Sequence, residues 1–248
     1  MEHPEVLTIA YGTVCLIWLV VSRLLPYWRT PERPTFEKPW REIGYALLAA
    51  LLVIGLGQLW LHGVRLPNHT AWRTVFESIN QIVIFSPMLL LLLWRRQTLV
   101  SAWLPGRQLA PRLAIGLGLA LIALAIYAAA ERGAPSFLST LQRVFDPANS
   151  HVAVQVLLED ITIAILMVRL GAALTNKWAV VVAAALFAGG HIPTMVSEGA
   201  SSVQLIGLFR DFGLGVLVIG TASRGADILW FWPVHYALDM TQFLGNAA

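Results

Sequence analysis

The feature that most constrains this chain is a succession of apolar runs, each long enough to cross or enter a lipid bilayer. A span needs about 20 apolar residues, because the hydrocarbon core is roughly 30 Å thick and an α-helix rises about 1.5 Å per residue. Since lipid offers backbone amides no hydrogen-bond partner, the expected fold class is an all-α, polytopic transmembrane helix bundle. The sequence predicts about eight membrane helices, near 5–25, 43–62, 78–95, 111–130, 152–174, 178–192, 201–221 and 226–245.

Composition supports a membrane protein. Charged residues make up 12% of the chain, whereas soluble proteins carry roughly 25%. The ten Trp residues agree with this, because Trp collects at membrane–water interfaces. The net charge of +3 is small and comes from loops, so no nucleic-acid partner is expected. Cys15 is the only cysteine, which excludes an intrachain disulfide and a cysteine-based metal site.

The chain reads as one membrane domain over residues 1–248, without a repeat or a soluble domain. The first apolar run follows an acidic start and no small-residue cleavage site ends it, so we expect a retained helix rather than a signal peptide. Residues 1–130 form the N-terminal helices and residues 151–245 a second, more polar half. The loop 131–151 between them is long enough to hold an interfacial helix.

Basic residues of the loops are distributed unevenly between the two sides of the predicted bundle. Eleven fall on one side and four on the other. The positive-inside rule places the more basic side in the cytoplasm, with both termini opposite, in a multi-pass protein of the cell membrane. The eleven are Arg23, Arg29, Arg33, Lys38, Arg41, Arg95, Arg96, Arg107, Arg112, Lys177 and Arg224, and the four are Arg65, Arg73, Arg132 and Arg143.

The two halves differ in their charge at membrane depth. The first four spans are mostly Leu, Ala, Ile and Gly, whereas the last four carry ionisable side chains. Such a group costs at least about 2.5–3.5 kcal/mol at the bilayer centre, so it faces the bundle interior and usually marks a functional site. The working part is therefore predicted within 151–245. Its ionisable residues at or near membrane depth are Glu159, Asp160, Arg169, His191, Arg210, Asp211, His235 and Asp239.

Three helices of this half can bring a carboxylate and two histidines to one depth. Glu159 and Asp160 are adjacent on the fifth predicted helix, and His191 ends the sixth. His235 and Asp239 are spaced i, i+4 on the eighth, so the aspartate can orient the histidine. A glutamate in an apolar cavity can take a proton from water near neutral pH. Two histidines can hold that water, hydrogen-bond a developing oxyanion or ligate a metal.

Several of these residues also have a purely structural interpretation. Arg210 and Asp211 are more simply an ion pair, and Arg169, near the cytoplasmic end of its helix, is expected to extend to the interface. Either histidine alone is equally well explained by a hydrogen bond to a neighbouring helix. Asp239 can be a helix-end carboxylate, and Phe187 is more readily a packing residue than a chemical one.

Three short patterns nevertheless occur in a fixed order along the last helices. Glu159-Asp160 comes first, Phe187-Ala-Gly-Gly-His191 second and His235-Tyr-Ala-Leu-Asp239 third. Together they resemble the CPBP intramembrane proteases, also called the Abi or CAAX-protease family. That family shows Glu-Glu-x-x-x-Arg, Phe-x-x-x-His and His-x-x-x-Asn or Asp on successive membrane helices. The resemblance covers roughly residues 150–245.

The resemblance implies an intramembrane endopeptidase that hydrolyses a peptide bond of a membrane-associated peptide or protein. It implies Glu159, with Asp160 beside it, as the base that activates water, and His191 as its partner. It assigns oxyanion or ligand roles to His235 and Asp239. Either a zinc ion held by Glu159, His191 and His235 or a metal-free glutamate mechanism fits these residues.

The chain departs from the family at one position, because Ala164 stands where the first motif has its arginine. Arg169 is ten residues from Glu159, about 15 Å along a helix, so it cannot simply replace that arginine. Arg210 is a better candidate for the missing counter-charge. The departure keeps a second hypothesis open, a degenerate member that binds or scaffolds another membrane protein without cleaving it. A third is a proton or ion pathway built on the same charges.

Overall fold

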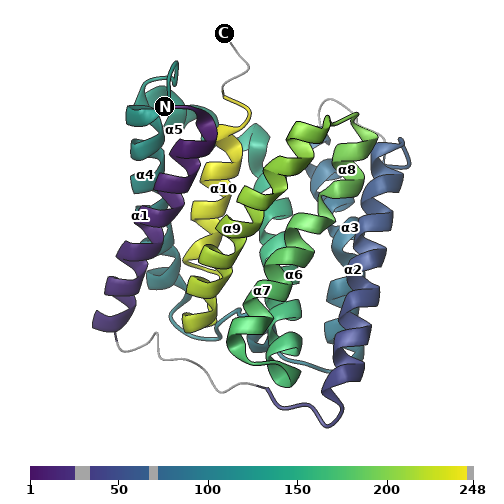
Figure 1. Cartoon of the computed structure of the whole chain (residues 1–248). Coiled ribbons are helices and arrows are strands. Elements are labelled where there is room, and N and C mark those ends of the chain that lie inside the picture. Colours follow the sequence, from purple (N-terminus) through teal and green to yellow (C-terminus); the bar gives the residue numbers. More distant parts are fainter. Residues whose placement is uncertain (26–33, 67–71, 245–248) are drawn as a thin grey trace.

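The computed structural model describes residues 1–25, 34–66 and 72–244, and within them it is an all-α bundle without strands (Figure 1). Seven helical segments are long and apolar enough to cross a membrane, which makes the chain a multi-pass membrane protein. Their helices are α1 (His3–Leu24), α2 (Pro39–Leu61), α3 (Arg73–Trp94), α4 (Leu109–Ala130), α6 (Ser150–Ala173), α7 (Asn176–Gly190) and α9 (Ser202–Gly225).

Shorter helices connect or complete these spans. The loop 131–151 holds a helix, α5 (Phe137–Val144), and the 3₁₀ turn η4 (Pro147–Asn149) leads from it into α6. After α7 the chain continues as α8 (Ile192–Ser197), and a second 3₁₀ turn, η3 (Leu99–Ala102), lies between α3 and α4. The last helix is α10 (Phe231–Thr241).

The eighth predicted span, 226–245, is wrong as a full crossing, and position 245 lies outside the described residues. The helix α10 has only 11 residues, which corresponds to roughly 16 Å. It starts late because Asp227 shapes a turn: one carboxylate oxygen accepts the backbone N–H of Leu229 at 2.8 Å, and the other pairs with Arg112 of α4. The predicted span 226–245 placed Asp227 inside a membrane helix. In the structure, a buried ion pair holds Asp227 in the turn before α10.

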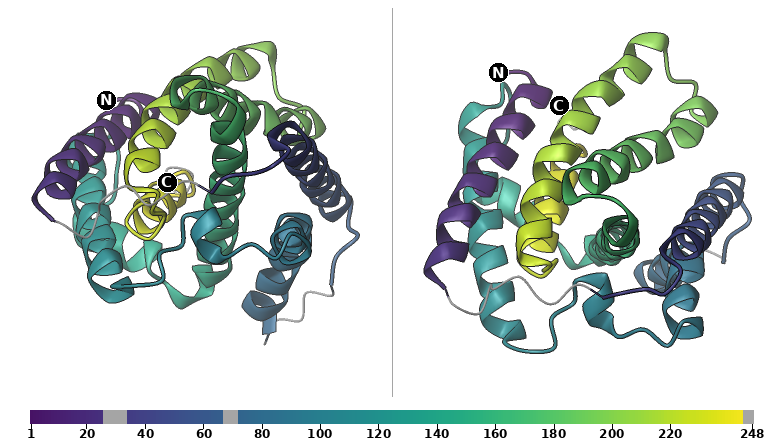
Figure 2. Two further views of the ribbon diagram at one scale, coloured as in Figure 1. Left: turned by 90° about the horizontal axis from the view of Figure 1, so that it is seen from below. Right: turned by 60° about the horizontal axis from the view of Figure 1, so that its bottom comes forward.

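The short helix α10 lies inside the bundle rather than at its edge. It packs against α4 and α6, and Figure 2 shows it enclosed by α1, α4, α6 and α9. At its start the indole rings of Trp18 and Trp230 stack with centroids 4.3 Å apart, and both are fully buried. A Cβ on Gly116 of α4 would lie 2.7 Å from the carbonyl oxygen of Leu229, so only glycine permits this close approach.

The alternating helices place the loops of like charge at the same end of the bundle. The loops that follow α1, α3, α6 and α9 lie at the lower end in Figure 1, and these are the basic loops of the sequence count. Two residues of that count, Arg29 and Arg33, lie outside the described residues. The lower end is called the basic face below.

Arg169 does not extend to the interface, so this expectation is wrong. Its side chain is fully buried, and its Nε lies 3.6 Å from Oε2 of Glu42 on α2. It also donates to the side-chain oxygen of Gln97 and, at 3.2 Å, to the carbonyl of Ile165. The other oxygen of Glu42 lies 2.6 Å from an Nη of Arg95. A buried carboxylate on the neighbouring helix thus offers Arg169 a partner that is nearer than the interface.

Candidate functional site

The five candidate catalytic residues line one cavity. It has a volume of about 440 Å³, within the range usual for small-molecule and substrate sites. Its walls come from α1, α6, α7, α9 and α10, and Phe231, Trp103 and Ile228 add apolar lining. The candidate residues on these walls are Glu159, Asp160, His191, His235 and Asp239. Their chemical roles remain predictions.

Asp160 and His235 form the central contact of the site. The Nδ1 atom of His235 lies 2.9 Å from Oδ1 of Asp160, in ion-pair and hydrogen-bond range. Asp160 is only 2% exposed, and Phe231 stacks on the histidine ring with centroids 5.2 Å apart. A histidine that donates from Nδ1 to a buried carboxylate has a fixed ring orientation and presents Nε2 to the other side.

This geometry differs from the expected partnership between His235 and Asp239. An Asp239 oxygen accepts a hydrogen bond from the amide of Gln242 at 2.7 Å, while His235 is held by Asp160. Sequence spacing favoured Asp239 because it lies one turn away on the same helix. The structure shows that a carboxylate from α6 reaches His235 across the helix interface instead.

Glu159 lies beside this pair with a different environment. It is half-buried, and one carboxylate oxygen accepts a hydrogen bond from the amide of Gln155, one turn earlier on α6, at 2.9 Å. Adjacent residues on a helix point about 100° apart, so Asp160 faces α10 while Glu159 also lines the open space. One carboxylate therefore supports a histidine, and the other is left available to water.

His191 lies at the end of α7, where the chain turns into α8, and it is exposed. Phe187, one turn earlier, packs edge-on against its ring with centroids 4.9 Å apart. The same phenyl ring lies 6.5 Å from the ring of His235. Phe187 thus lies against the rings of both histidines, in agreement with its interpretation as a packing residue.

Arg210 pairs with Asp211, as its structural interpretation predicts. The Nη2–Oδ1 distance is 3.2 Å, but the two side chains are 45% and 40% exposed, so the pair lies at the rim of the cavity and not in the bundle interior. No hydrogen bond or ion pair joins Arg210 to Glu159 or Asp160 in the part of the chain that the structure describes. The position of the family arginine is filled by the buried methyl group of Ala164.

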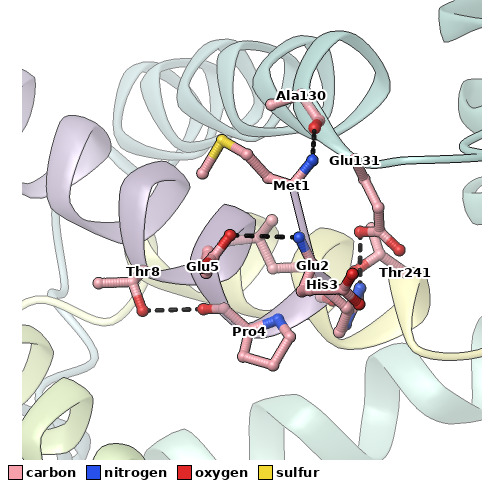
Figure 3. A network of polar contacts seen from close by, with 10 residues as sticks. Met1, Glu2, His3, Pro4, Glu5, Thr8, Ala130, Glu131 and Thr241 are labelled. Carbon is pink, nitrogen blue, oxygen red and sulfur yellow. Dashed lines mark hydrogen bonds and ion pairs between the residues drawn. The ribbon is translucent and has the colours of Figure 1, made fainter.

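Sequence reasoning missed the three cavity residues of α1, because it assigned the chemistry to the second half alone. His3, Leu7 and Tyr11 of α1 line the same cavity. Their spacing of four residues places them on one helix face, which is the signal that could have identified them. His3 is fixed at the rim by Glu131, with 2.7 Å between Nδ1 and Oε2 (Figure 3).

The predicted zinc set of Glu159, His191 and His235 is not assembled here. Among residues 1–25, 34–66 and 72–244, no three His, Cys, Asp or Glu side chains form a group that could hold a metal ion. Zinc requires nitrogen ligands at about 2.0–2.1 Å, whereas the neighbour of both imidazoles is the phenyl ring of Phe187. The residues as arranged do not fit a three-ligand metal site, so no chemical step is assigned to a metal below.

Removal of metal ions is therefore expected to leave the protein unchanged. We predict that dialysis against a strong chelator leaves the unfolding temperature unchanged, because no ligand group for a metal is assembled among the described residues. Elemental analysis of the purified chain checks this directly. Stoichiometric zinc that is lost in a His191→Ala variant would contradict the prediction and restore the zinc set.

Comparison of the chain with known protein families, with characterised proteins and with solved structures finds no match.

Proposed function

We propose that this protein is an intramembrane endopeptidase of the CPBP type, which hydrolyses a peptide bond of a membrane-associated substrate. One observation carries the proposal: Glu159, His191 and an Asp160-supported His235 line a single cavity within a transmembrane bundle. Buried ionisable groups are too costly in membrane helices to be kept without a role. The motif resemblance supplies the reaction class, and the cavity supplies a place for it.

In the proposed reaction, Glu159 takes a proton from a water molecule in the cavity. The resulting hydroxide oxygen forms a bond to the carbonyl carbon of the substrate, and negative charge moves to the carbonyl oxygen. The Nε2 side of His235, which Asp160 leaves facing away, stabilises this oxyanion when it carries a proton. The carbon–nitrogen bond then breaks, and the proton taken by Glu159 passes to the leaving amine. His191 completes the polar wall beside the water.

A second candidate is a protein that binds membrane partners without cleaving them. The observation in its favour is Ala164, which places a buried methyl group where the family has its arginine. Arg210 does not fill this gap, because it pairs with Asp211 at the rim. Under this hypothesis the cavity binds a segment of a partner protein, but it lacks the positive charge that the arginine of the first motif supplies in the CPBP family.

Quantitative proteomics of cells that express wild-type protein or Glu159→Gln separates the two candidates. A protease predicts new peptide termini in wild-type membranes, and accumulation of the same intact proteins with Glu159→Gln. Glu198→Gln is the matched control, because this exposed glutamate follows α8 and does not line the cavity. Identical termini in all three samples would leave the binding protein as the better account.

A further inference from the structure

A second cavity lies on the basic face and shares no lining residue with the candidate site. Its volume is about 520 Å³, and its walls come from residues 34–38, the first turns of α2 and the segment after α3. Several of the lining side chains are cationic or carry a hydroxyl group and can bind an anion. They include Thr35, Lys38, Arg41, Arg95 and Thr98.

The cavity carries an excess of positive charge. Its two carboxylates are Glu37 and Glu42, and Glu42 is already shared between Arg95 and the buried Arg169. The other two cationic side chains of the cavity, Lys38 and Arg41, are exposed and form no ion pair with a described residue. Arg41 instead donates to the hydroxyl of Tyr45 at 3.0 Å, which leaves its charge unneutralised.

Two tryptophans fix the depth of this cavity in the membrane. Trp40 of α2 and Trp94 of α3 precede the cavity residues Arg41 and Arg95 in the sequence and are 67% and 61% exposed. Exposed Trp side chains on membrane helices lie at headgroup level. The ring of Trp94 packs edge-on against Tyr45, a cavity residue, with centroids 5.0 Å apart. The cationic cavity therefore opens where phosphate groups of lipids lie.

We propose that this cavity binds the phosphate headgroup of an anionic phospholipid. Lys38 and Arg41 donate charge-assisted hydrogen bonds to the phosphate oxygens, and the hydroxyl groups of Thr35 and Thr98 complete the shell. The start of α2 adds the positive end of a helix dipole. The acyl chains lie along the exposed leucines of α2 and α3, such as Leu48 and Leu90. This site is independent of the proposed proteolysis.

Binding is measured with the full purified chain in neutral nanodiscs, by titrating phosphatidylglycerol against phosphatidylcholine and counting bound lipid by native mass spectrometry. We expect preferential retention of phosphatidylglycerol. Lys38→Gln and Arg41→Gln should each weaken it about five-fold, the effect of one basic residue near a membrane surface. Arg107→Gln is the matched control, because this exposed arginine belongs to the same basic face but does not line the cavity.

Two further arms make the outcome decisive. A photoactivatable phosphatidylglycerol should crosslink the wild-type chain within 34–45 and 95–101, a readout that needs no variant to fold. Inorganic phosphate at millimolar concentration should not displace the lipid, since the acyl chains contribute to binding. Equal weakening by Arg107→Gln, crosslinks elsewhere, or displacement by inorganic phosphate alone would each overturn the assignment of a lipid headgroup.

Discussion

Replacement of Asp160 by Asn is expected to slow the proposed peptide-bond hydrolysis by about 10²–10⁴-fold, the range for loss of a correctly positioned acid–base group. The reason is the 2.9 Å contact between Asp160 and Nδ1 of His235. A carboxylate there fixes the histidine ring and its tautomer, whereas the amide of Asn can donate an N–H to Nδ1 and so favour a rotated ring or the other tautomer. The rate is measured on a substrate identified by its new termini.

Asp239→Asn is the matched control for this variant. Asp239 lines the same cavity on the same helix as His235, but its oxygen accepts from Gln242. We therefore expect a rate at least ten-fold closer to wild type than that of Asp160→Asn. Unfolding temperatures in detergent establish that both variants are folded. A larger loss for Asp239→Asn would show that the sequence spacing, and not the observed contact, identifies the partner of His235.

Replacement of Arg169 by Met is expected to lower the free energy of unfolding by about 3–5 kcal/mol. The side chain is fully buried between Glu42, Gln97 and the carbonyl of Ile165. Its removal leaves Glu42 buried with Arg95 as the remaining partner, and the polar groups that faced the guanidinium lose their donor. Unfolding of the purified protein by denaturant in mixed micelles measures the change.

Two controls distinguish the buried pair from charge in general. Arg210→Met removes an exposed pair with Asp211, so its effect should stay within about 1 kcal/mol. The double variant Glu42→Gln, Arg169→Met should be less destabilised than the sum of the single variants, because the two residues interact. Equal effects of Arg169→Met and Arg210→Met would contradict the assignment of Arg169 as a buried structural cation.

Most of the fold was predictable, because hydropathy reports directly on which helices meet lipid. The seven spans and the short helix α5 follow from runs of apolar residues and the loop between them. The length of α10 was not predictable in this way. Its segment is rich in apolar residues, but these are covered by other helices, and Asp227 breaks it through a partner 115 residues away. Hydropathy cannot separate burial in protein from burial in lipid.

The candidate site was predictable in its members but not in its contacts. Motif order and membrane depth identified the five residues that share the cavity. The pairing of Asp160 with His235 joins residues 75 positions apart, and local spacing carries no information about it. Arg169 illustrates the same limit, since its helix position suggests the interface while Glu42 of α2 holds it inside. Helix α1 also lines the cavity, through His3 and Tyr11. In the sequence, the only sign of this was the spacing of four residues between His3, Leu7 and Tyr11.

The most direct test of the central claim follows the oxygen atom of the attacking water. Purified protein, reconstituted with the membrane proteins of its own cells, is incubated in water enriched in oxygen-18, and new carboxyl termini are read by mass spectrometry. Hydrolysis in this cavity predicts one heavy oxygen in each new terminus with wild-type protein and no such termini with Glu159→Gln. Labelled termini that form equally with Glu159→Gln, or that do not form with wild-type protein, would contradict the account.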